Sequence, residues 1–393
     1  MFLYILVLFL IILNVYRYDI KGSVNNKYSS FYWLVFSLFL IAGLRYHIGI
    51  DTMRYELSFV NTSPLFSLRL SDIDFEELSQ PLWFFINSFF RSFTDDFVII
   101  QIFHSAVFHV LLARFILRTS VKPFVVLGIV YCVVWWNFSF EIMRESLCVV
   151  IYANALLSLN SRKYKSYIFS ALLCIGIHWF SFVIFIITPF VYYCSRKLLV
   201  AIVAISGILI LALDSTEIAS SIYALTMFSD GESSERIVSY LESDTNGIVS
   251  LSFWGIAFII LSQVVYPVLV SKQMTKDNEL LFFSKVLLLY VIFVLLRINI
   301  LIFDRFCNYL VLLLIIYTVN IISERTSRLN NFYKVYLYIG ITILTFQGIN
   351  TFIKPSPLEY RSEISYDCRY IPYKSVFQDP DVNRENLYRS YNL

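Results

Sequence analysis

Long apolar runs recur along nearly the whole chain, and this repetition limits the fold more than any other feature. An apolar run of roughly 20 residues is long enough to cross a bilayer as a helix. Charged residues make up only 15% of the sequence, against the roughly 25% typical of soluble domains. The sequence therefore predicts an all-α polytopic membrane protein built as one continuous bundle, with lipid as the solvent for most of the chain.

The spacing of these runs predicts about 11 to 12 transmembrane helices, at ~20 residues for each crossing. Candidate spans are residues 1 to 16, 29 to 46, 97 to 117, 123 to 139, 145 to 159, 198 to 213, 251 to 271, 281 to 300, 306 to 322 and 332 to 352. Two segments are ambiguous, because residues 81 to 93 are short for one crossing and residues 166 to 193 are long for one. We expect one transmembrane domain over residues 1 to 353, followed by a partly irregular tail over residues 354 to 393.

Basic loops set the expected orientation. Lys and Arg gather at residues 17 to 27, 162 to 165, 272 to 276 and 325 to 334, which the positive-inside rule places in the cytoplasm. Loops 46 to 96 and 214 to 250, and the tail, then face outward. This arrangement holds if residues 81 to 93 lie in the outer interface and residues 166 to 193 form two short helices that turn near His178. The alternative threads 81 to 93 across and makes 166 to 193 one helix, but it exports Arg114, Arg118, Lys122, Arg162, Lys163 and Lys165.

In the preferred topology the polar residues near the membrane converge on the outer side. They are Arg45, His47, Asp51, Arg54, Tyr55, Glu56, Glu141, Arg144, Glu145, His178, Arg297, Asp304 and Arg305. A charged side chain deep in a membrane helix costs roughly 2.5 to 3.5 kcal/mol on insertion scales, so such residues usually face a bundle interior or a water-filled cavity. The convergence predicts one polar site at the outer face.

The arginines indicate the kind of ligand that this site binds. A guanidinium is a planar fork that matches phosphate oxygens, stays charged at physiological pH, and can stabilise a pyrophosphate leaving group in place of a metal. The candidate binding residues are Arg45, Arg54, Tyr55, Arg144, Arg297 and Arg305. They predict a lipid-pyrophosphate ligand. The alternative is that arginines near helix ends extend to the interface and bind nothing.

Three residues are candidates for catalysis. Asp51 and Glu141 each offer a carboxylate that can take a proton from a sugar hydroxyl as it attacks an anomeric carbon. Each is equally suited to a salt bridge, and Glu141 is spaced to pair with Arg144 on a helix. His178 lies in an apolar stretch, which is typical of a buried, hydrogen-bonded histidine, but its place at a helix break favours contact with a ligand.

Several function classes find no support in the sequence. It has no Walker loop, dinucleotide fingerprint, HExxH motif or nucleophile elbow, and its cysteines show no metal-type spacing. We therefore expect no cofactor and no metal. The net charge of +3 is dispersed along the chain, which argues against binding to nucleic acid.

Gly43 to Glu56 reads GLRYHIGIDTMRYE, and this stretch resembles the hallmark of the EpsG family within the Wzy-type O-antigen and capsule polymerases. Two weaker matches follow in the order expected for that family, IMRESL at Ile142 to Leu147 and IHWFS at Ile177 to Ser181. A basic KYK turn at residues 163 to 165 lies between them. Only the first motif is specific.

The resemblance implies a metal-independent glycosyltransferase, similar to the GT-C architecture, in the bacterial inner membrane with its active site facing the periplasm. Such enzymes transfer a growing glycan from undecaprenyl pyrophosphate to the non-reducing end of a newly flipped repeat unit. Their partners are these lipid-linked glycans and the bilayer, and whether a chain-length regulator docks is left open. Carried over to this sequence, Arg45 and Arg144 would hold pyrophosphate, Asp51 and His178 would lie near the acceptor, and Gly43 and Gly49 would allow close backbone approach. Loop 214 to 250 is long enough to cap a glycan cavity.

Three other functions compete with the polymerase. A flippase or transporter of lipid-linked sugars would also need arginines in a cavity, but it would spread them over the bilayer depth and show repeat symmetry. An acyltransferase would need a base next to a cytoplasmic channel, and His178 lies on the wrong side for that role. The O-antigen ligase differs mainly in its acceptor, and the Gly43 to Glu56 motif, rather than physics, favours the polymerase.

Overall fold

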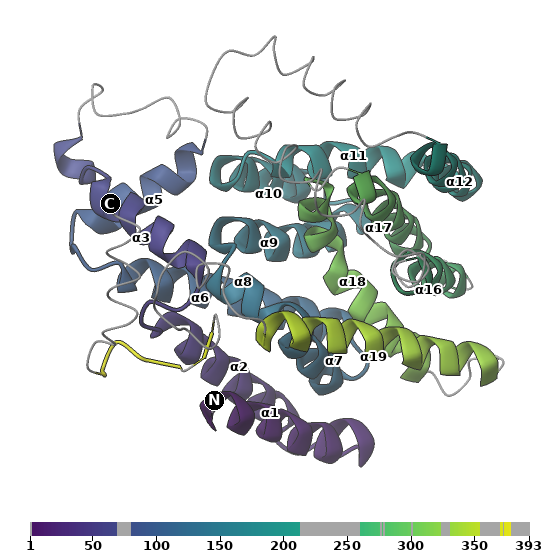
Figure 1. The fold of residues 1–393 in the computed structure, drawn as a ribbon, viewed down its shortest axis with the longest axis horizontal. Coiled ribbons are helices and arrows are strands. Elements are labelled where there is room, and N and C mark those ends of the chain that lie inside the picture. The colour runs from purple at the N-terminus through teal and green to yellow at the C-terminus, as the bar shows by residue number, and fades with distance from the viewer. Residues whose placement is uncertain are drawn as a thin grey trace, which may run out of the picture. The chain divides into compact units, whose positions relative to one another are not determined.

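The computed structural model describes residues 2–68, 80–212, 260–275, 277, 280–299, 302–323, 331–353, 370, 371 and 373–378 (Figure 1). These residues are mostly helical, and their only β structure is an isolated antiparallel bridge between Arg45 and Ser375. The all-α prediction is therefore confirmed. Loop 214 to 250 and most of the tail lie outside the described residues, so what we expect of them stays a prediction.

The chain divides into two compact units. The first comprises Met1–Val183 and Thr342–Leu393, and the second comprises Ile184–Ile341. The boundaries fall inside two helices, α11 (Ser181–Tyr193) and α19 (Asn331–Ile353). The short C-terminal segment that the structure describes thus belongs with the N-terminal helices. The predicted division at residue 353 remains a prediction.

The first unit is a bundle of helices in which α2 packs on α6, α9 lies between α6 and α10, and α1 lies against α7 (Figure 1). Its helical elements are α1 (Phe2–Asn14), η1 (Val15–Ile20), α2 (Lys27–Gly43), α3 (Ile50–Asn61), η2 (Leu65–Ser67), α5 (Pro81–Arg91), α6 (Val98–Thr119), α7 (Pro123–Val130), η4 (Tyr131–Trp135), α8 (Trp136–Phe140), α9 (Met143–Asn160) and α10 (Tyr164–Ile177). The helices α7, η4 and α8 follow one another without a break, as do α1 and η1.

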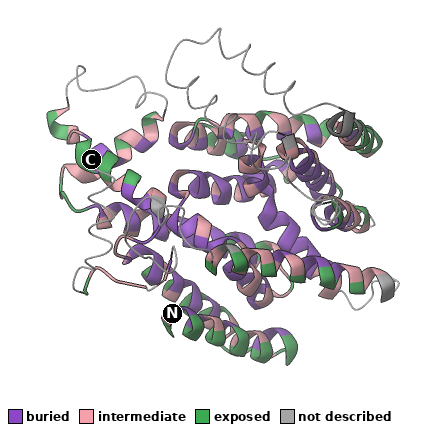
Figure 2. Ribbon diagram, in the orientation of Figure 1, coloured by how far each residue is buried: buried purple, intermediate pink, exposed green. Residues whose placement is uncertain are grey.

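In the second unit α17 packs against α12, α16 and α18. Its elements are α12 (Arg196–Ala212), η5 (Ile260–Val265), α16 (Tyr266–Met274), α17 (Leu281–Asn299) and α18 (Phe303–Ser323). Most side chains of α18 are buried, which is the pattern of a helix at the centre of its bundle (Figure 2).

Among the described residues, five helical segments are long and apolar enough to cross a membrane, judged by length and composition. They are Phe2–Ile20, Val98–Thr119, Pro123–Phe140, Leu281–Ile298 and Phe303–Ser323. Two shorter apolar helices, Tyr164–Ile177 and Ser181–Tyr193, accompany them. These segments agree with the predicted spans to within a few residues, and the chain is a multi-pass membrane protein.

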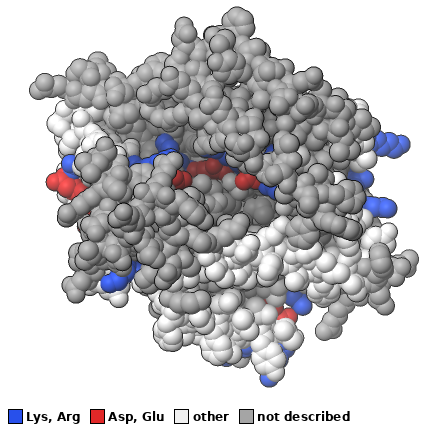
Figure 3. Space-filling view, viewed as in Figure 1, with Lys and Arg blue, Asp and Glu red and all other residues white. Residues whose placement is uncertain are grey.

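The first helix shows why lipid is the appropriate solvent. Tyr4, Val7 and Ile11 lie three and four residues apart, so they share one face of α1, and this face is buried. The other side exposes apolar residues such as Ile5 and Phe9. On the face of the molecule shown in Figure 3, the described surface over α1 and α2 carries few charged side chains. A surface of this composition is stable in a hydrocarbon environment.

The two ambiguous segments have distinct outcomes. Residues 81 to 93 contain α5, an 11-residue helix; at 1.5 Å per residue this covers about half of a hydrocarbon core of roughly 30 Å. Residues 166 to 193 contain α10 and α11, and His178 between them has extended backbone angles (φ −150°, ψ 101°). The predicted break into two short helices near His178 is confirmed, and the reversal of the chain at that break remains a prediction. The placement of α5 in the outer interface remains a prediction.

Gly348 generates a test of the packing of α19 in the first unit. A β-carbon at this position would overlap the carbonyl oxygen of Cys132 and lie 2.5 Å from the α-carbon of Val133, so α19 and η4 touch through backbone atoms. We expect Gly348→Ala to lower the unfolding temperature of the detergent-purified protein, because overpacking costs roughly 1–3 kcal/mol. Gly207→Ala is the matched control, since nothing lies within 4 Å of a β-carbon there. Equal unfolding temperatures for both variants would contradict this contact.

Candidate functional site

The family-like stretch forms the end of α2, a tight loop and the start of α3. Gly43, the last residue of α2, lies so close to α6 that a β-carbon would be 3.4 Å from the α-carbon of Ile102. Gly49 precedes α3 with a φ of +95°, a value that only glycine adopts readily. A β-carbon on Gly49 would also overlap the carbonyl oxygen of Phe140. Both glycines therefore allow close backbone approach.

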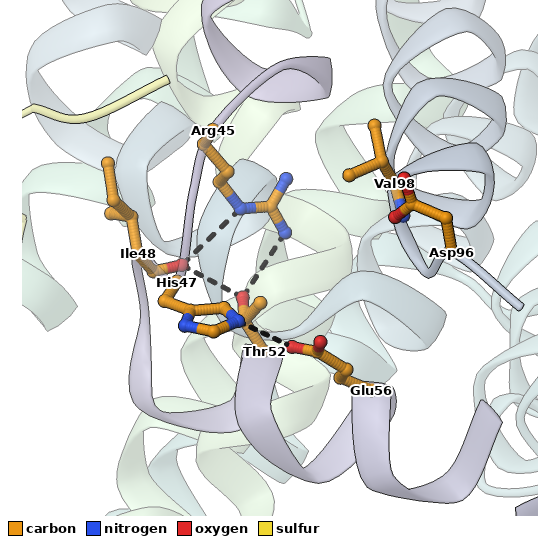
Figure 4. Close-up of polar contacts among 7 residues, drawn as sticks. All are labelled: Arg45, His47, Ile48, Thr52, Glu56, Asp96 and Val98. Atoms are coloured by element: carbon orange, nitrogen blue, oxygen red, sulfur yellow. Dashed lines mark hydrogen bonds and ion pairs between the residues drawn. The ribbon is translucent and has the colours of Figure 1, made fainter. Parts of the chain in front are cut away.

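Arg45 lies inside this loop with an exposure of 0%. Its Nε donates to the carbonyl oxygen of Ile48 at 3.3 Å, and its Nη2 donates to the hydroxyl of Thr52 at 3.2 Å (Figure 4). Its Nη1 donates to the carbonyl oxygen of Ala42, at the end of α2. The guanidinium also lies over the ring of Phe140, 5.4 Å from its centroid. Arg45 thus ties together the two helices that flank the loop.

Glu141 holds the start of α3. It lies in the turn between α8 and α9, and its Oε2 accepts a hydrogen bond of 2.9 Å from the backbone N–H of Asp51. The first N–H groups of a helix have no partner within the helix, and a carboxylate is favoured at that end. The hydroxyl of Thr52 lies 2.7 Å from the carbonyl oxygen of Phe140, which fixes the same two segments. The buried Glu141 carboxylate also interacts electrostatically with Arg45.

Arg144, in the first turn of α9, is the arginine that faces the side chains of α3. Its guanidinium lies 5.2 Å from the ring centroid of Tyr55, and its Nη1 donates to Oε1 of Gln80 at 2.7 Å. Its Nε is buried and has no hydrogen-bond partner among the described residues. Burial raises the pKa of the Tyr55 hydroxyl above its usual value, and Arg144 offsets part of that rise. Arg144 is thus a partly exposed arginine with one N–H group that no described residue engages.

Two acidic side chains of α3 pair with neighbours, Glu56 with His47 of the preceding loop and Asp51 with Arg54 of the same helix. His47 Nε2 lies 3.2 Å from Glu56 Oε2 (Figure 4), and Arg54 Nη1 lies 4.0 Å from Asp51 Oδ1. The side chain of Arg54 is 69% exposed and that of Asp51 is 40% exposed. Exposed pairs of this kind contribute little to stability, so both side chains can turn towards a ligand at small cost.

A series of contacts through α5 runs from Arg144 to the end of α10, which precedes His178. Gln80, just before α5, receives the hydrogen bond from Arg144. Leu82, two residues later, packs against Gly176 near the end of α10, where a β-carbon would come within 2.8 Å of it. His178 follows that helix end and is buried. The first unit thus brings together Asp51, Tyr55, Glu141 and Arg144. His178 lies two residues after Gly176, which contacts Leu82 of α5.

Arg297 and Arg305 belong to the second unit. Arg297 donates to the Asp304 carboxylate and to the side-chain oxygen of Gln263, so its N–H groups hold α17, α18 and η5 together. Its predicted role, and that of Arg305, in binding the same ligand as Arg144 stays a prediction. Among the described residues, no three His, Cys, Asp or Glu side chains gather in the manner of metal ligands.

A buried polar network beneath the loop was missed by sequence reasoning. The indole N–H of Trp135 donates to His109 Nε2 at 2.8 Å, and since indole only donates, the proton of His109 lies on Nδ1 and is donated to the carbonyl oxygen of Ser105 at 2.7 Å. His104 bonds to Ser146 at 2.9 Å. These contacts join α6 to η4 and α9. The presence of two histidines, His104 and His109, in an apolar span could have indicated this network, because polar side chains in membrane helices often form hydrogen bonds between helices.

Gly49 provides a test of the loop geometry. We expect Gly49→Ala to lower the unfolding temperature more than Gly22→Ala does, because both residues have a positive φ but only Gly49 lies against backbone. At Gly22 nothing lies within 4 Å of a β-carbon, so alanine costs only the left-handed conformation, ~1–2 kcal/mol. Thermal unfolding of both variants in the same detergent is the measurement. A smaller loss for Gly49→Ala would contradict the contact with Phe140.

Comparison with known proteins gives one match. The model of the EpsG family matches residues 28–375, which is nearly the whole chain. Searches of curated proteins and of solved structures find no match. The matched range runs from α2 to the residue that bridges Arg45, and it therefore includes every contact of the loop described above. The chain belongs to the EpsG family, which is associated with polysaccharide polymerase-like proteins.

Proposed function

We propose that this protein polymerises lipid-linked oligosaccharide repeat units into O-antigen or a related surface polysaccharide, on the outer face of the bacterial inner membrane. Family membership supports a polymerase-like role in general. The observation that carries the more specific proposal is Arg144, a guanidinium with a buried Nε that no described residue engages, held between Tyr55 and Gln80. A site of this kind suits a phosphate oxygen.

The proposed donor is the growing glycan on undecaprenyl pyrophosphate, and the acceptor is the non-reducing end of a newly flipped repeat unit. The acceptor hydroxyl oxygen attacks the anomeric carbon of the donor, and the bond from that carbon to the pyrophosphate oxygen breaks. The electron pair leaves with the pyrophosphate, and Arg144 and Arg54 stabilise its charge. The hydroxyl proton passes to the carboxylate of Asp51.

The proposal gives each nearby residue a distinct task. Asp51 is suited to act as the base, because its side chain is partly exposed while its backbone N–H is fixed by Glu141. Glu141 is buried and caps α3, so it positions the base. Tyr55 shapes the floor of the site beneath Arg144. His178 lies on the acceptor side.

Arginine substitutions test the proposed function. In a strain that lacks this gene, we expect Arg144→Ala to leave single repeat units on the lipid, with polymerisation reduced roughly 100-fold or more, as when one donor to a developing oxyanion is removed. Arg114→Ala is the matched control, because Arg114 is an exposed arginine in α6. Gel analysis of lipid-linked glycans, with membrane levels of each variant, is the measurement. Long chains from Arg144→Ala, or no repeat units at the outer face of the wild type, would show that the polymerase proposal is wrong.

Two carboxylate substitutions separate the base from the helix cap. We expect Asp51→Asn to abolish polymer at a normal membrane level, because an amide accepts no proton from the hydroxyl. Glu141→Gln keeps an oxygen that accepts from the Asp51 N–H, so polymer should persist at a reduced level. Glycan ladders of the two variants are compared at equal protein. If Glu141→Gln is inactive and Asp51→Asn is active, the roles of the two carboxylates are exchanged.

A further inference from the structure

The described C-terminal residues form a strap on the loop that carries Arg45. We use the term C-terminal strap for residues 370, 371 and 373–378. The N–H of Tyr46 donates to the carbonyl oxygen of Lys374 at 3.0 Å, and the N–H of Val376 donates to the carbonyl oxygen of Leu44 at 3.0 Å. These bonds flank Arg45 and Ser375, which form the antiparallel bridge. The strap therefore satisfies the backbone of the loop on both sides of Arg45.

Aromatic side chains anchor the strap to the bundle. Tyr370 is 2% exposed, and its ring stacks on Phe352 with centroids 5.6 Å apart. It also lies 5.6 Å from the ring of Phe140, the residue whose carbonyl oxygen holds Thr52. The hydroxyl of Tyr4 donates to the carbonyl oxygen of Tyr370 at 3.1 Å. The strap is thus fixed by the first helix, by α8 and by α19.

A second anchor joins the strap to the end of α2. The hydroxyl of Tyr373 donates to the carbonyl oxygen of Ile41 at 3.2 Å, one residue before the carbonyl that Arg45 engages. Burial raises the pKa of the Tyr373 hydroxyl to about 12, so it remains a donor at physiological pH. The last turn of α2 has carbonyl groups without helical partners, and these two side chains satisfy two of them.

Arg45 and the strap act on the same backbone from opposite sides. The guanidinium reaches Ala42, Ile48 and Thr52 from within the bundle, and the strap reaches Leu44 and Tyr46 from outside. Thr52 follows Asp51 in the first turn of α3. A shift of the loop would therefore move Asp51 away from the carboxylate of Glu141.

We propose that the C-terminal strap and Arg45 are positioning elements of the proposed active site, and that Arg45 braces the loop instead of binding the pyrophosphate of the donor. This inference rests on the proposed function for the identity of the site. Arg45 has no exposed surface, and its Nε, Nη1 and Nη2 all donate to protein atoms. Arg144, by contrast, is partly exposed, and its Nε has no hydrogen-bond partner among the described residues.

A cross-linking experiment tests the contact without any measurement of activity. Tyr46 and Lys374 lie opposite each other next to the bridging pair Arg45 and Ser375, and a backbone hydrogen bond joins them. Hydrogen-bonded opposite residues of antiparallel strands have α-carbons about 5.5 Å apart, a separation that a disulfide spans. In the full chain carrying Tyr46→Cys and Lys374→Cys, we expect oxidation to give a linked peptide by mass spectrometry. The single variants and the pair Tyr46→Cys with Phe377→Cys are controls. Absence of the link, or equal linkage of the Phe377 pair, would overturn the strap.

Substitutions at Tyr370 test the effect of the strap on the reaction. We expect Tyr370→Ala to lower polymer yield at equal membrane level, and Tyr370→Phe to restore it because the ring that stacks on Phe352 returns. Phe377→Ala is the matched control, since Phe377 is an aromatic residue of the same segment that is 81% exposed. Full-length polymer from Tyr370→Ala, or an equal loss from Phe377→Ala, would overturn the positioning role.

Inorganic pyrophosphate separates positioning from binding. The measurement is the pyrophosphate concentration that gives half of the maximal rise in the unfolding temperature of the protein. We expect this concentration to be unchanged in Arg45→Lys and to rise at least about tenfold in Arg144→Lys, because the loss of one charged hydrogen bond has an effect of that size. Polymer yield should fall in both variants. A rise for Arg45→Lys would place Arg45 in the binding site and overturn its bracing role. If pyrophosphate raises the unfolding temperature of neither the wild type nor the variants, the pyrophosphate part of the proposed function is wrong. The cross-link and the Tyr370 substitutions then still test the role of the C-terminal strap.

Discussion

A guanidinium withdrawn from water needs an acceptor for its N–H groups, and the first unit is organised around that requirement at Arg45. A buried charge without partners costs several kcal/mol. The acceptors come from the end of α2, from Ile48 in the loop and from Thr52 in α3, while the carboxylate of Glu141 supplies an opposite charge nearby. Four segments of chain are therefore held in one arrangement by a single side chain.

The same stretch of sequence contains a buried arginine that stabilises the fold and an exposed arginine that can contact a ligand. Arg45 has no exposed surface, whereas nine residues later the side chain of Arg54 is 69% exposed and pairs only loosely with Asp51. Because α3 is fixed at its first turn, the residues that follow along it stand on a rigid support. Preorganised groups of this kind stabilise developing charge without having to rearrange during the reaction.

The sequence was sufficient for the fold class, for most helix positions and for the break at His178, because apolar runs and their interruptions determine these features locally. It was also sufficient to bring Asp51, Tyr55, Glu141 and Arg144 into one list. It could not show that Arg45 points inward and Arg144 towards Tyr55, since both are arginines at helix ends and their surroundings depend on residues far along the chain. It also assigned residues 370–378 to an irregular tail, because a bridge to Arg45 is a contact across more than 300 positions and leaves no local pattern.

The hydrogen bond from Tyr4 to Tyr370 joins residues separated by 366 positions. During synthesis, residues 370–378 follow α1 and every other described helix. Until those residues emerge from the ribosome, the loop around Arg45 is without the outer partners of Leu44 and Tyr46, however early its flanking helices enter the bilayer. This site is therefore completed only after every described helix has been synthesised, and a nascent chain interrupted before residue 370 has the helices α1 to α10 of the first unit without the hydrogen bonds that residues 373–378 form with the loop.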